Sequence, residues 1–265
     1  MSAFAPSGPR MIQPEEFPSW IVEEDEDVVV VNKPGDIVCH PSKNGPWSSL
    51  VGACREHLGL PRVHMIYRLD RETSGVMVFA KNNVAASRLQ RAVEGRRVKK
   101  TYIAILCGEF AAPVVVDEPL GRDLSSPIAA RQTVVRGPEG RPAVTEFTPL
   151  LASGGFTLAL VRPRTGRQHQ IRVHASHIGH ALVGDKMYGP NPLLFLEFIE
   201  HGFTDAMERQ LVLPRHALHA LEMVFDPGEG GRPFRAPLAD DLAEFARDRM
   251  GTSRKEIEQL IASLH

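Results

Sequence analysis

The sequence predicts an α+β fold, and two kinds of pattern support this prediction. Short runs of β-branched and apolar residues indicate strands, whereas apolar residues spaced three or four positions apart indicate helices. The two kinds of segment do not follow the regular strand–helix alternation of a doubly wound parallel sheet. We therefore expect strands and helices that are mixed along the chain and packed into a single α+β domain.

Five segments have the composition of buried strands, because they are short and rich in Val, Ile and Leu. The first ends at the turn Lys33-Pro34-Gly35, and Gly154-Gly155 separates the last two, which we expect to pair as a hairpin. The predicted strands are 27–32, 76–80, 98–106, 144–151 and 156–161.

Four segments carry the apolar spacing of helices. Asn83 is the expected N-cap of the second helix and Gly95 its end, while Ser253 and Glu256 have the spacing of a capping box for the last. The last helix carries an apolar stripe that includes Ile257 and Leu264. The predicted helices are 48–58, 83–94, 167–178 and 253–264.

Composition is typical of a soluble globular protein, since 43% of the 265 residues are hydrophobic and 24% are charged. No run approaches the roughly 18 apolar residues of a membrane span. The first 18 residues contain prolines but no apolar core of a secretory signal. Three cysteines without a CxxC pair favour a reducing compartment. We expect a cytoplasmic protein that does not associate with membranes.

The net charge of −1 conceals a strong segregation of charge. Residues 62–100 contain ten basic and three acidic side chains, and residues 162–186 contain five and one. Residues 15–27 contain seven acidic side chains and no basic one. The basic segments could form one positive face for a polyanion. The alternative is that each run is ordinary solvated surface.

A first concentration of reactive side chains is the segment YRLDRETSG at 67–75, directly before the predicted strand 76–80. Asp70 stands between Arg68 and Arg71, whose positive charges favour the ionised carboxylate. An ionised carboxylate on a loop can act as a nucleophile or a general base. A surface turn with a local ion pair is the alternative.

A second concentration is RPRTGRQHQIRVH at 162–174. Thr165 and Gly166 precede a predicted helix, whose free N–H groups favour an anionic partner. On that helix His169 and Arg172 fall on one face, opposite an apolar face that can pack on the core. The alternative is an exposed basic helix.

Together these segments resemble one family. YRLDRETSGVMVFAK resembles the HRLDxxTSGxxxxAK signature of the RluA branch of pseudouridine synthases, and RPRTGRQHQIRVHASHIGHALVGDKMYG resembles its closing motif. The intervening KKTYIA at 99–104 resembles the family's KxYxA element, and NKPGDIVCHP at 32–41 resembles its opening segment. Four motifs in the same order, over roughly residues 25–225, identify the chain as a member of this family.

The resemblance implies a mixed, largely antiparallel sheet flanked by helices and loops, and an enzyme that isomerises uridine in structured RNA to pseudouridine. The expected partner is an rRNA or tRNA stem-loop, and no cofactor or metal is expected. Asp70 falls on the family's catalytic aspartate, Tyr102 on the tyrosine that packs under the target base, and Arg172 on the arginine that pairs with the aspartate. Arg68 falls on the arginine that holds RNA with the target nucleotide flipped out.

We expect these arginines to belong to a wider basic surface around Asp70 that contacts RNA phosphates. Its predicted members, with His169, are Arg68, Arg71, Arg96, Arg97, Lys99, Lys100, Arg164 and Arg167.

The family usually has histidine where this chain has Tyr67. This departure supports a rival hypothesis, namely a catalytically idle RNA-binding or ribosome-assembly protein on the same fold. The histidines at 169–180 do not converge on a helix, so they do not predict a metal site. The predicted organisation is a flexible Pro-rich arm at 1–20, a catalytic domain at 21–230 and a helical C-terminal extension at 231–265. We expect a monomer without the N-terminal S4 domain common in the family.

Overall fold

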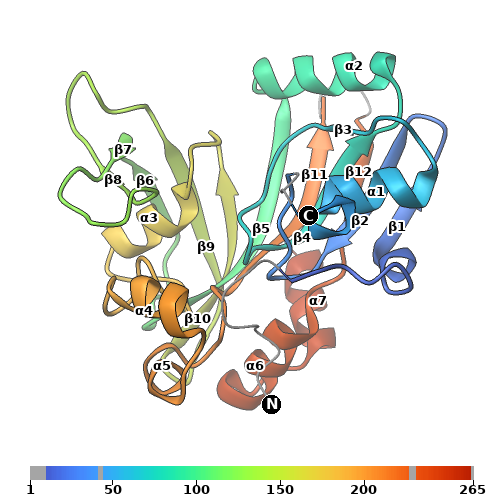
Figure 1. Cartoon of the computed structure of the whole chain (residues 1–265). Coiled ribbons are helices and arrows are strands. Elements are labelled where there is room, and N and C mark those ends of the chain that lie inside the picture. Colours follow the sequence, from blue (N-terminus) through green and yellow to red (C-terminus); the bar gives the residue numbers. More distant parts are fainter. Residues whose placement is uncertain (1–9, 41–43, 227–230, 264–265) are drawn as a thin grey trace. The chain divides into compact units, whose positions relative to one another are not determined.

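The computed structural model describes residues 10–40, 44–226 and 231–263 (Figure 1). These residues form two compact units, each described here by itself. The Asp70 unit comprises the described residues up to 100 together with 219–237, and the Arg172 unit comprises 101–218 together with the described residues from 238 onward.

The Asp70 unit is built on the sheet order β1-β2-β4-β11. Strands β1 and β2 are antiparallel to each other, as are β2 and β4, while β11 runs parallel to β4. The short strands β3 and β12 pair with β4 and β11. The strands are β1 (Ile21–Glu24), β2 (Val28–Lys33), β3 (His64–Met65), β4 (Ser74–Ala80), β11 (Leu218–Phe225) and β12 (Pro233–Arg235).

Two α-helices and two 3-10 helices complete this unit: α1 (Leu50–Leu58), α2 (Asn83–Glu94), η1 (Phe17–Trp20) and η2 (Pro46–Ser48). The side chain that caps α2 is Asn82, which accepts from the Ala85 N–H, so the expectation that Asn83 is the cap is wrong by one residue. Part of the predicted arm is folded, because residues 17–20 form η1 and Phe17 is fully buried. Residues 1–9 of that arm lie outside the described residues.

The Arg172 unit has an antiparallel sheet of order β5-β10-β9-β6 and a separate hairpin, β7–β8. Gly154 and Gly155 form the predicted turn between β9 and β10, and both have positive φ. Strand β5 begins in the Asp70 unit. The strands are β5 (Val98–Cys107), β6 (Val114–Asp117), β7 (Leu120–Arg122), β8 (Gln132–Val134), β9 (Val144–Ser153) and β10 (Phe156–Pro163).

Five helices belong to this unit: α3 (Gln170–His177), α4 (Leu194–His201), α5 (Asp205–Leu211), α6 (Asp240–Met250) and α7 (Arg254–Ala262). The capping box of Ser253 and Glu256 is confirmed at the start of α7. Ile257 of the predicted stripe is fully buried, whereas Leu264 lies outside the described residues. The buried guanidinium of Arg215 binds Asp241 through two hydrogen bonds of 2.6 and 2.7 Å, which anchor α6.

The predicted α+β class with a largely antiparallel sheet is therefore confirmed. The domain boundaries at 20 and 230 stay predictions. No helix within the described ranges is both long and apolar enough to cross a lipid bilayer.

Candidate active site

Asp70 lies in the loop that leads into β4, and a buried lysine holds this loop in place. Lys33, at the end of β2, is fully buried, and its ammonium donates to the carbonyls of Pro34 (2.9 Å), Ile37 (3.0 Å) and Arg71 (2.8 Å). The last of these carbonyls belongs to the residue after Asp70. A buried ammonium is stable only when its N–H groups have acceptors. These three hydrogen bonds therefore connect the opening NKPGDIV segment to the Asp70 loop.

Two further features fix the path of the loop around Asp70. The Thr73 N–H donates to the Asp70 carbonyl at 3.1 Å, which closes a turn. Gly75 follows with φ of +114°, and a Cβ there would lie 2.2 Å from the carbonyl oxygen of Ala220 on the parallel strand β11. Only glycine fits this close approach, so the backbone at the end of the RLDRETSG motif is tightly constrained.

Cys39 packs beside the same loop, and its thiol donates to the Leu69 carbonyl at 3.3 Å. Burial raises the pKa of Cys39, the charge of Lys33 opposes this, and the charge of Asp70 adds to it. The thiol therefore stays protonated at neutral pH, and Cys39 packs as a small buried side chain.

The two arginines that flank Asp70 differ in their surroundings. Arg68 is exposed, whereas Arg71 forms a 2.5 Å ion pair with Asp36, whose side chain is only 5% exposed. Asp36 follows Gly35 in the opening motif and has a positive φ of 69°. The sequence motif does not indicate this partner, whose carboxylate neutralises much of the charge that Arg71 was expected to offer to RNA.

Tyr67, the departure from the usual histidine, has a structural role. Its hydroxyl donates to the carbonyl of Val76 on β4 at 2.9 Å, and its ring tilts against Phe225 on β11. A tyrosine side chain is longer than a histidine side chain, and the Tyr67 hydroxyl joins the loop to the strand that follows it. The Asp70 loop is therefore held to β4 with tyrosine in place of the usual histidine.

In the other unit, Arg172 on α3 is 7% exposed and is held by Asp185. The Arg172 Nε donates to Asp185 Oδ2 at 2.7 Å, and Nη2 donates to Oδ1 at 2.9 Å. Asp185 Oδ1 also accepts from the backbone N–H groups of Met187 and Tyr188, both at 2.9 Å. Burial by itself would raise the pKa of Asp185, but the Arg172 charge and hydrogen bonds, followed by His216, bring it well below its usual value. Asp185 is thus ionised and fixes the guanidinium.

Helix α3 is positioned by buried polar contacts. Gln170, its first residue, accepts from the Thr165 hydroxyl (2.7 Å) and the Arg167 N–H (3.0 Å) and donates to the Val144 carbonyl (2.9 Å). The helix begins three residues later than predicted, because His169 has a left-handed φ of 54° that no helical residue can adopt.

The histidines of this region have structural partners. His174 contacts the Thr145 hydroxyl at 2.8 Å and the Glu118 carbonyl at 3.0 Å, and burial lowers the pKa of His174, so it is neutral. Within the described residues, no group of three or more His, Cys, Asp or Glu side chains could hold a metal ion.

Tyr102 lies on β5 with 8% exposure, opposite Val161 of β10. The structure thus brings Tyr102, Arg172 and His169 into one unit, while Asp70 belongs to the other. The predicted pairing of Arg172 with Asp70 stays a prediction. Asp185, which lies within the closing motif, is a partner of Arg172 that was not predicted from the sequence.

The predicted RNA-binding residues are also divided between the units. Arg96 and Lys99 are exposed, and Arg97 pairs with Asp226 at 3.2 Å. Burial lowers the pKa of Lys100. In the Arg172 unit, Arg164 pairs with Glu146 and the Arg167 Nε donates to the Pro142 carbonyl at 3.1 Å. Several of the predicted cations therefore have partners within the protein.

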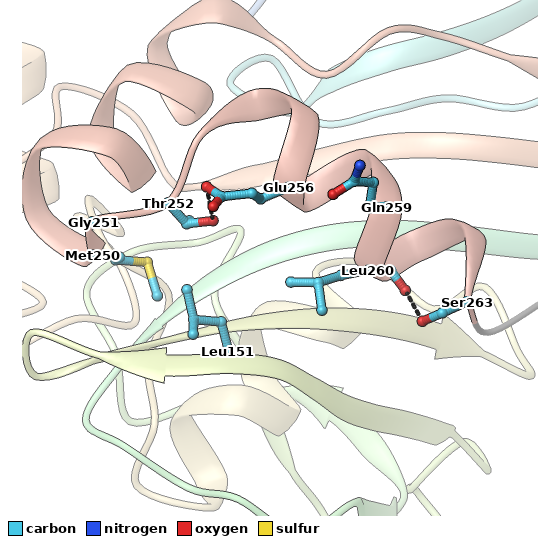
Figure 2. A pocket seen from close by; sticks show the side chains of 8 residues that line it. All are labelled: Leu151, Met250, Gly251, Thr252, Glu256, Gln259, Leu260 and Ser263. Carbon is cyan, nitrogen blue, oxygen red and sulfur yellow. Dashed lines mark hydrogen bonds between the residues drawn. The ribbon is translucent and has the colours of Figure 1, made fainter.

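A pocket of about 450 Å³ lies between β9 and the helices α6 and α7 (Figure 2). Its floor is apolar, and the Glu256 carboxylate at its rim is engaged by the capping box. Its lining residues are Leu151, Met250, Gly251, Thr252, Glu256, Gln259, Leu260 and Ser263, none of which is a predicted site residue.

The Asp70 loop, held by Lys33, thus lies in one unit, and the Arg172 guanidinium, held by Asp185, lies in the other. The family model described as RNA pseudouridylate synthase matches residues 27–177, more than half of the chain, and the chain belongs to this family. It is therefore an enzyme that converts uridine in RNA to pseudouridine.

Curated relatives support this assignment. The chain is 37% identical over 236 residues to ribosomal large subunit pseudouridine synthase D of Vibrio vulnificus, covering 87% of this chain and 70% of that protein. It is 35% identical over 239 residues to the protein of the same name from Escherichia coli K12, covering 88% and 71%.

Solved structures share the fold. Human RNA pseudouridylate synthase domain containing 1 superposes with a TM-score of 0.68 at 24% identity, covering 100% of this chain and 97% of the other. Human RNA pseudouridylate synthase domain containing 4 superposes with a TM-score of 0.70 at 24% identity, covering 91% and 97%. These likenesses concern the architecture and confirm the predicted fold class.

Proposed function

We propose that this enzyme isomerises specific uridines in the RNA of the large ribosomal subunit, with Asp70 as its catalytic carboxylate. The relatives that are 35–37% identical are named as ribosomal large subunit pseudouridine synthases, which favours rRNA over tRNA as the substrate. The observation that carries the assignment of Asp70 is its loop, in which fully buried Lys33 binds the carbonyl of the adjacent residue. A catalytic carboxylate needs such a fixed backbone.

The proposed reaction conserves all atoms of the nucleotide. The N1–C1′ bond of the flipped-out uridine breaks, the uracil turns while it stays bound, and a new bond joins C5 to C1′. The proton on C5 is lost to solvent through a basic group, and N1 gains a proton. The ionised Asp70 carboxylate assists by attack or by stabilising the positive charge that develops at C1′. Isomerisation needs no oxidant or reductant.

Other residues have proposed roles that follow from the family resemblance. Tyr102 packs under the target base and offers a phenol for proton transfer. Arg172 keeps Asp70 ionised by its positive charge, and Asp185 holds that guanidinium in a fixed orientation. The exposed Arg68 and the predicted basic residues contact phosphates of a structured stem-loop. We propose that the protein acts in the cytoplasm as a monomer.

The experiment is the release of tritium from RNA labelled at C5 of uridine, because each isomerisation exchanges that hydrogen. The purified protein is incubated separately with large-subunit rRNA and with tRNA transcribed without modifications. We expect release from rRNA that reaches a whole-number stoichiometry. Release from tRNA alone would contradict the rRNA assignment, and no release from either RNA would favour the idle RNA-binding protein.

The idle alternative gained its support from Tyr67 in place of histidine. The Tyr67 hydroxyl binds the β4 backbone and leaves the Asp70 loop intact, so this substitution no longer favours loss of activity.

A further inference from the structure

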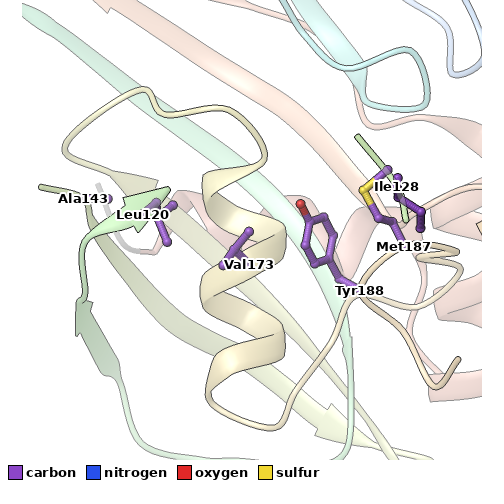
Figure 3. Close-up of a cluster of buried hydrophobic side chains, with 6 residues drawn as sticks. All are labelled: Leu120, Ile128, Ala143, Val173, Met187 and Tyr188. Carbon is purple, nitrogen blue, oxygen red and sulfur yellow. The ribbon is translucent and has the colours of Figure 1, made fainter. Parts of the chain in front are cut away.

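The side chain of Tyr188, from the closing GDKMYG segment, connects two of the predicted site residues. It is 4% exposed and belongs to an apolar cluster with Val173 of α3 and with Met187 (Figure 3). The Arg172 guanidinium lies over its ring, 4.9 Å from the centroid, and the Arg131 guanidinium lies 5.5 Å from the centroid. The ring is therefore clamped by packing and by two cations.

The hydroxyl of Tyr188 has two neighbours. The backbone N–H of Gln132 on β8 donates to it at 2.8 Å, and His169 Nδ1 lies 2.9 Å from it. Burial raises the pKa of Tyr188 to about 12, so the phenol keeps its proton at any physiological pH.

The direction of these hydrogen bonds follows from elementary counting of protons. A phenol oxygen has one proton to donate, and the Gln132 N–H can only donate. Within the described part of the chain, His169 Nδ1 is the acceptor that this proton can reach. His169 Nδ1 must then be unprotonated, and the neutral imidazole carries its proton on Nε2.

The backbone at His169 is also unusual. His169 precedes α3 in the left-handed conformation with φ of 54°, which non-glycine residues adopt only when the surrounding structure imposes it. Gln170, directly after it, is buried and held by four hydrogen bonds. The imidazole is therefore fixed at both its backbone and its Nδ1 atom, while His169 as a whole is partly exposed.

We propose that Tyr188 is a positioning residue that fixes His169 as the Nε2–H tautomer, so that the imidazole accepts through Nδ1 and donates through Nε2. The same phenol braces the Arg172 guanidinium through its ring. The tautomer is a property of the protein without RNA, whereas its effect on RNA binding rests on the proposed function.

The tautomer can be measured without RNA, by NMR of the intact protein labelled with ¹⁵N-histidine. His169→Gln identifies the His169 signals among those of the 11 histidines. We expect His169 Nδ1 to be unprotonated and Nε2 protonated in the wild type, and the other tautomer to appear in Tyr188→Phe, which lacks the donating hydroxyl. An Nδ1–H tautomer in the wild type, or no change in Tyr188→Phe, would overturn the proposal. This result does not depend on the identity of the RNA, so it separates failure of the inference from failure of the proposed function.

The second measurement is the steady-state kinetics of tritium release from rRNA. Loss of one neutral hydrogen bond should raise KM roughly two- to tenfold in Tyr188→Phe and in His169→Leu, with a smaller change in kcat. The double variant should be no worse than the worse single variant, because Tyr188 acts through His169. His169→Gln should recover most of the affinity, since its amide nitrogen donates from the position of Nε2.

Thr157→Val is the matched control. The buried Thr157 hydroxyl on β10 accepts from the Phe110 N–H at 3.1 Å and donates to the Gly108 carbonyl at 2.9 Å, so its hydrogen bonding resembles that of the Tyr188 hydroxyl. We expect Thr157→Val to leave KM unchanged. An equal rise in KM for this control, or additive effects in the Tyr188/His169 double variant, would assign Tyr188 a merely structural role.

Discussion

Replacing Asp185 by asparagine tests how Arg172 is held. In the native protein Asp185 has no exposed surface and accepts four hydrogen bonds, two from Arg172 and two from backbone N–H groups. The asparagine oxygen can still accept from the three groups that donate to Oδ1, namely the Arg172 Nη2 and the two backbone N–H groups. The asparagine NH₂ would face the Arg172 Nε–H, so two donors would meet where Oδ2 now accepts. The 7%-exposed guanidinium would then lose the negative charge of Asp185. Removing one partner of a buried ion pair lowers the free energy of unfolding by about 3–5 kcal/mol. Because asparagine keeps three of the four hydrogen bonds, we expect a loss of about 3 kcal/mol.

Urea unfolding measures this loss directly, and the matching decrease in Tm is roughly 10 °C for a chain of this size. The double variant Arg172→Met with Asp185→Leu replaces the pair by apolar side chains of similar volume. It should regain only part of the stability, because the Met187 and Tyr188 N–H groups lose their acceptor, and it should show no turnover, since the guanidinium is absent. A loss below about 1 kcal/mol in Asp185→Asn would refute the argument.

The lowered pKa of Asp185 also gives a pH dependence with a definite sign. A carboxylate with a depressed folded-state pKa stabilises the fold above its unfolded value of about 3.9, and this contribution is lost as the pH falls through the lower folded-state value. The difference in unfolding free energy between wild type and Asp185→Asn should therefore be constant near neutral pH and narrow below about pH 4. A difference that widens in acid would contradict the assignment.

Three further predictions follow from the Asp70 loop, the basic surface and the histidines. Lys33→Met removes the donor to one buried and two partly buried carbonyls, and it should lower the free energy of unfolding by about 3 kcal/mol and turnover with it. Lys81→Met, which removes a partly exposed pair with Glu24, should cost less than about 1 kcal/mol. Equal losses would contradict the role of Lys33. Arg96→Ala should make the slope of the logarithm of the RNA-binding constant against the logarithm of the salt concentration shallower by up to about one unit. Arg97→Ala should change this slope less, because Asp226 already pairs with Arg97. Binding that is independent of salt would refute the basic surface. EDTA should not inhibit the enzyme, and an inhibition reversed by zinc but not by magnesium would show a metal requirement.

The motifs were sufficient to predict the family, because they are contiguous in sequence and combine in a fixed order. The hairpin at Gly154-Gly155 and the capping box at Ser253 were also predicted, since both depend on interactions between residues close in sequence. The error of one residue at Asn82 arose because two consecutive asparagines can serve as a cap, and only the backbone conformation chooses between them.

The partners of the site residues could not be predicted, because they are distant in sequence. Asp36 reaches Arg71 across 35 positions, and Asp185 reaches Arg172 from beyond the end of α3. The late start of α3 depends on the left-handed backbone of His169, which has no sequence signature of its own. Strand β11 pairs with β4 from a point more than 140 residues away, and its parallel register requires the glycine at position 75.

The central claim is that the Asp70 carboxylate carries out the isomerisation, and the most direct measurement is tritium release from C5-labelled large-subunit rRNA by wild type and Asp70→Asn at equal concentration. The amide has the same shape but cannot act as an anionic nucleophile or base. We predict stoichiometric release by the wild type and none by Asp70→Asn, with RNA binding and thermal unfolding nearly unchanged. Turnover by Asp70→Asn within about tenfold of wild type, a difference of about 1.4 kcal/mol in activation free energy, would contradict the account.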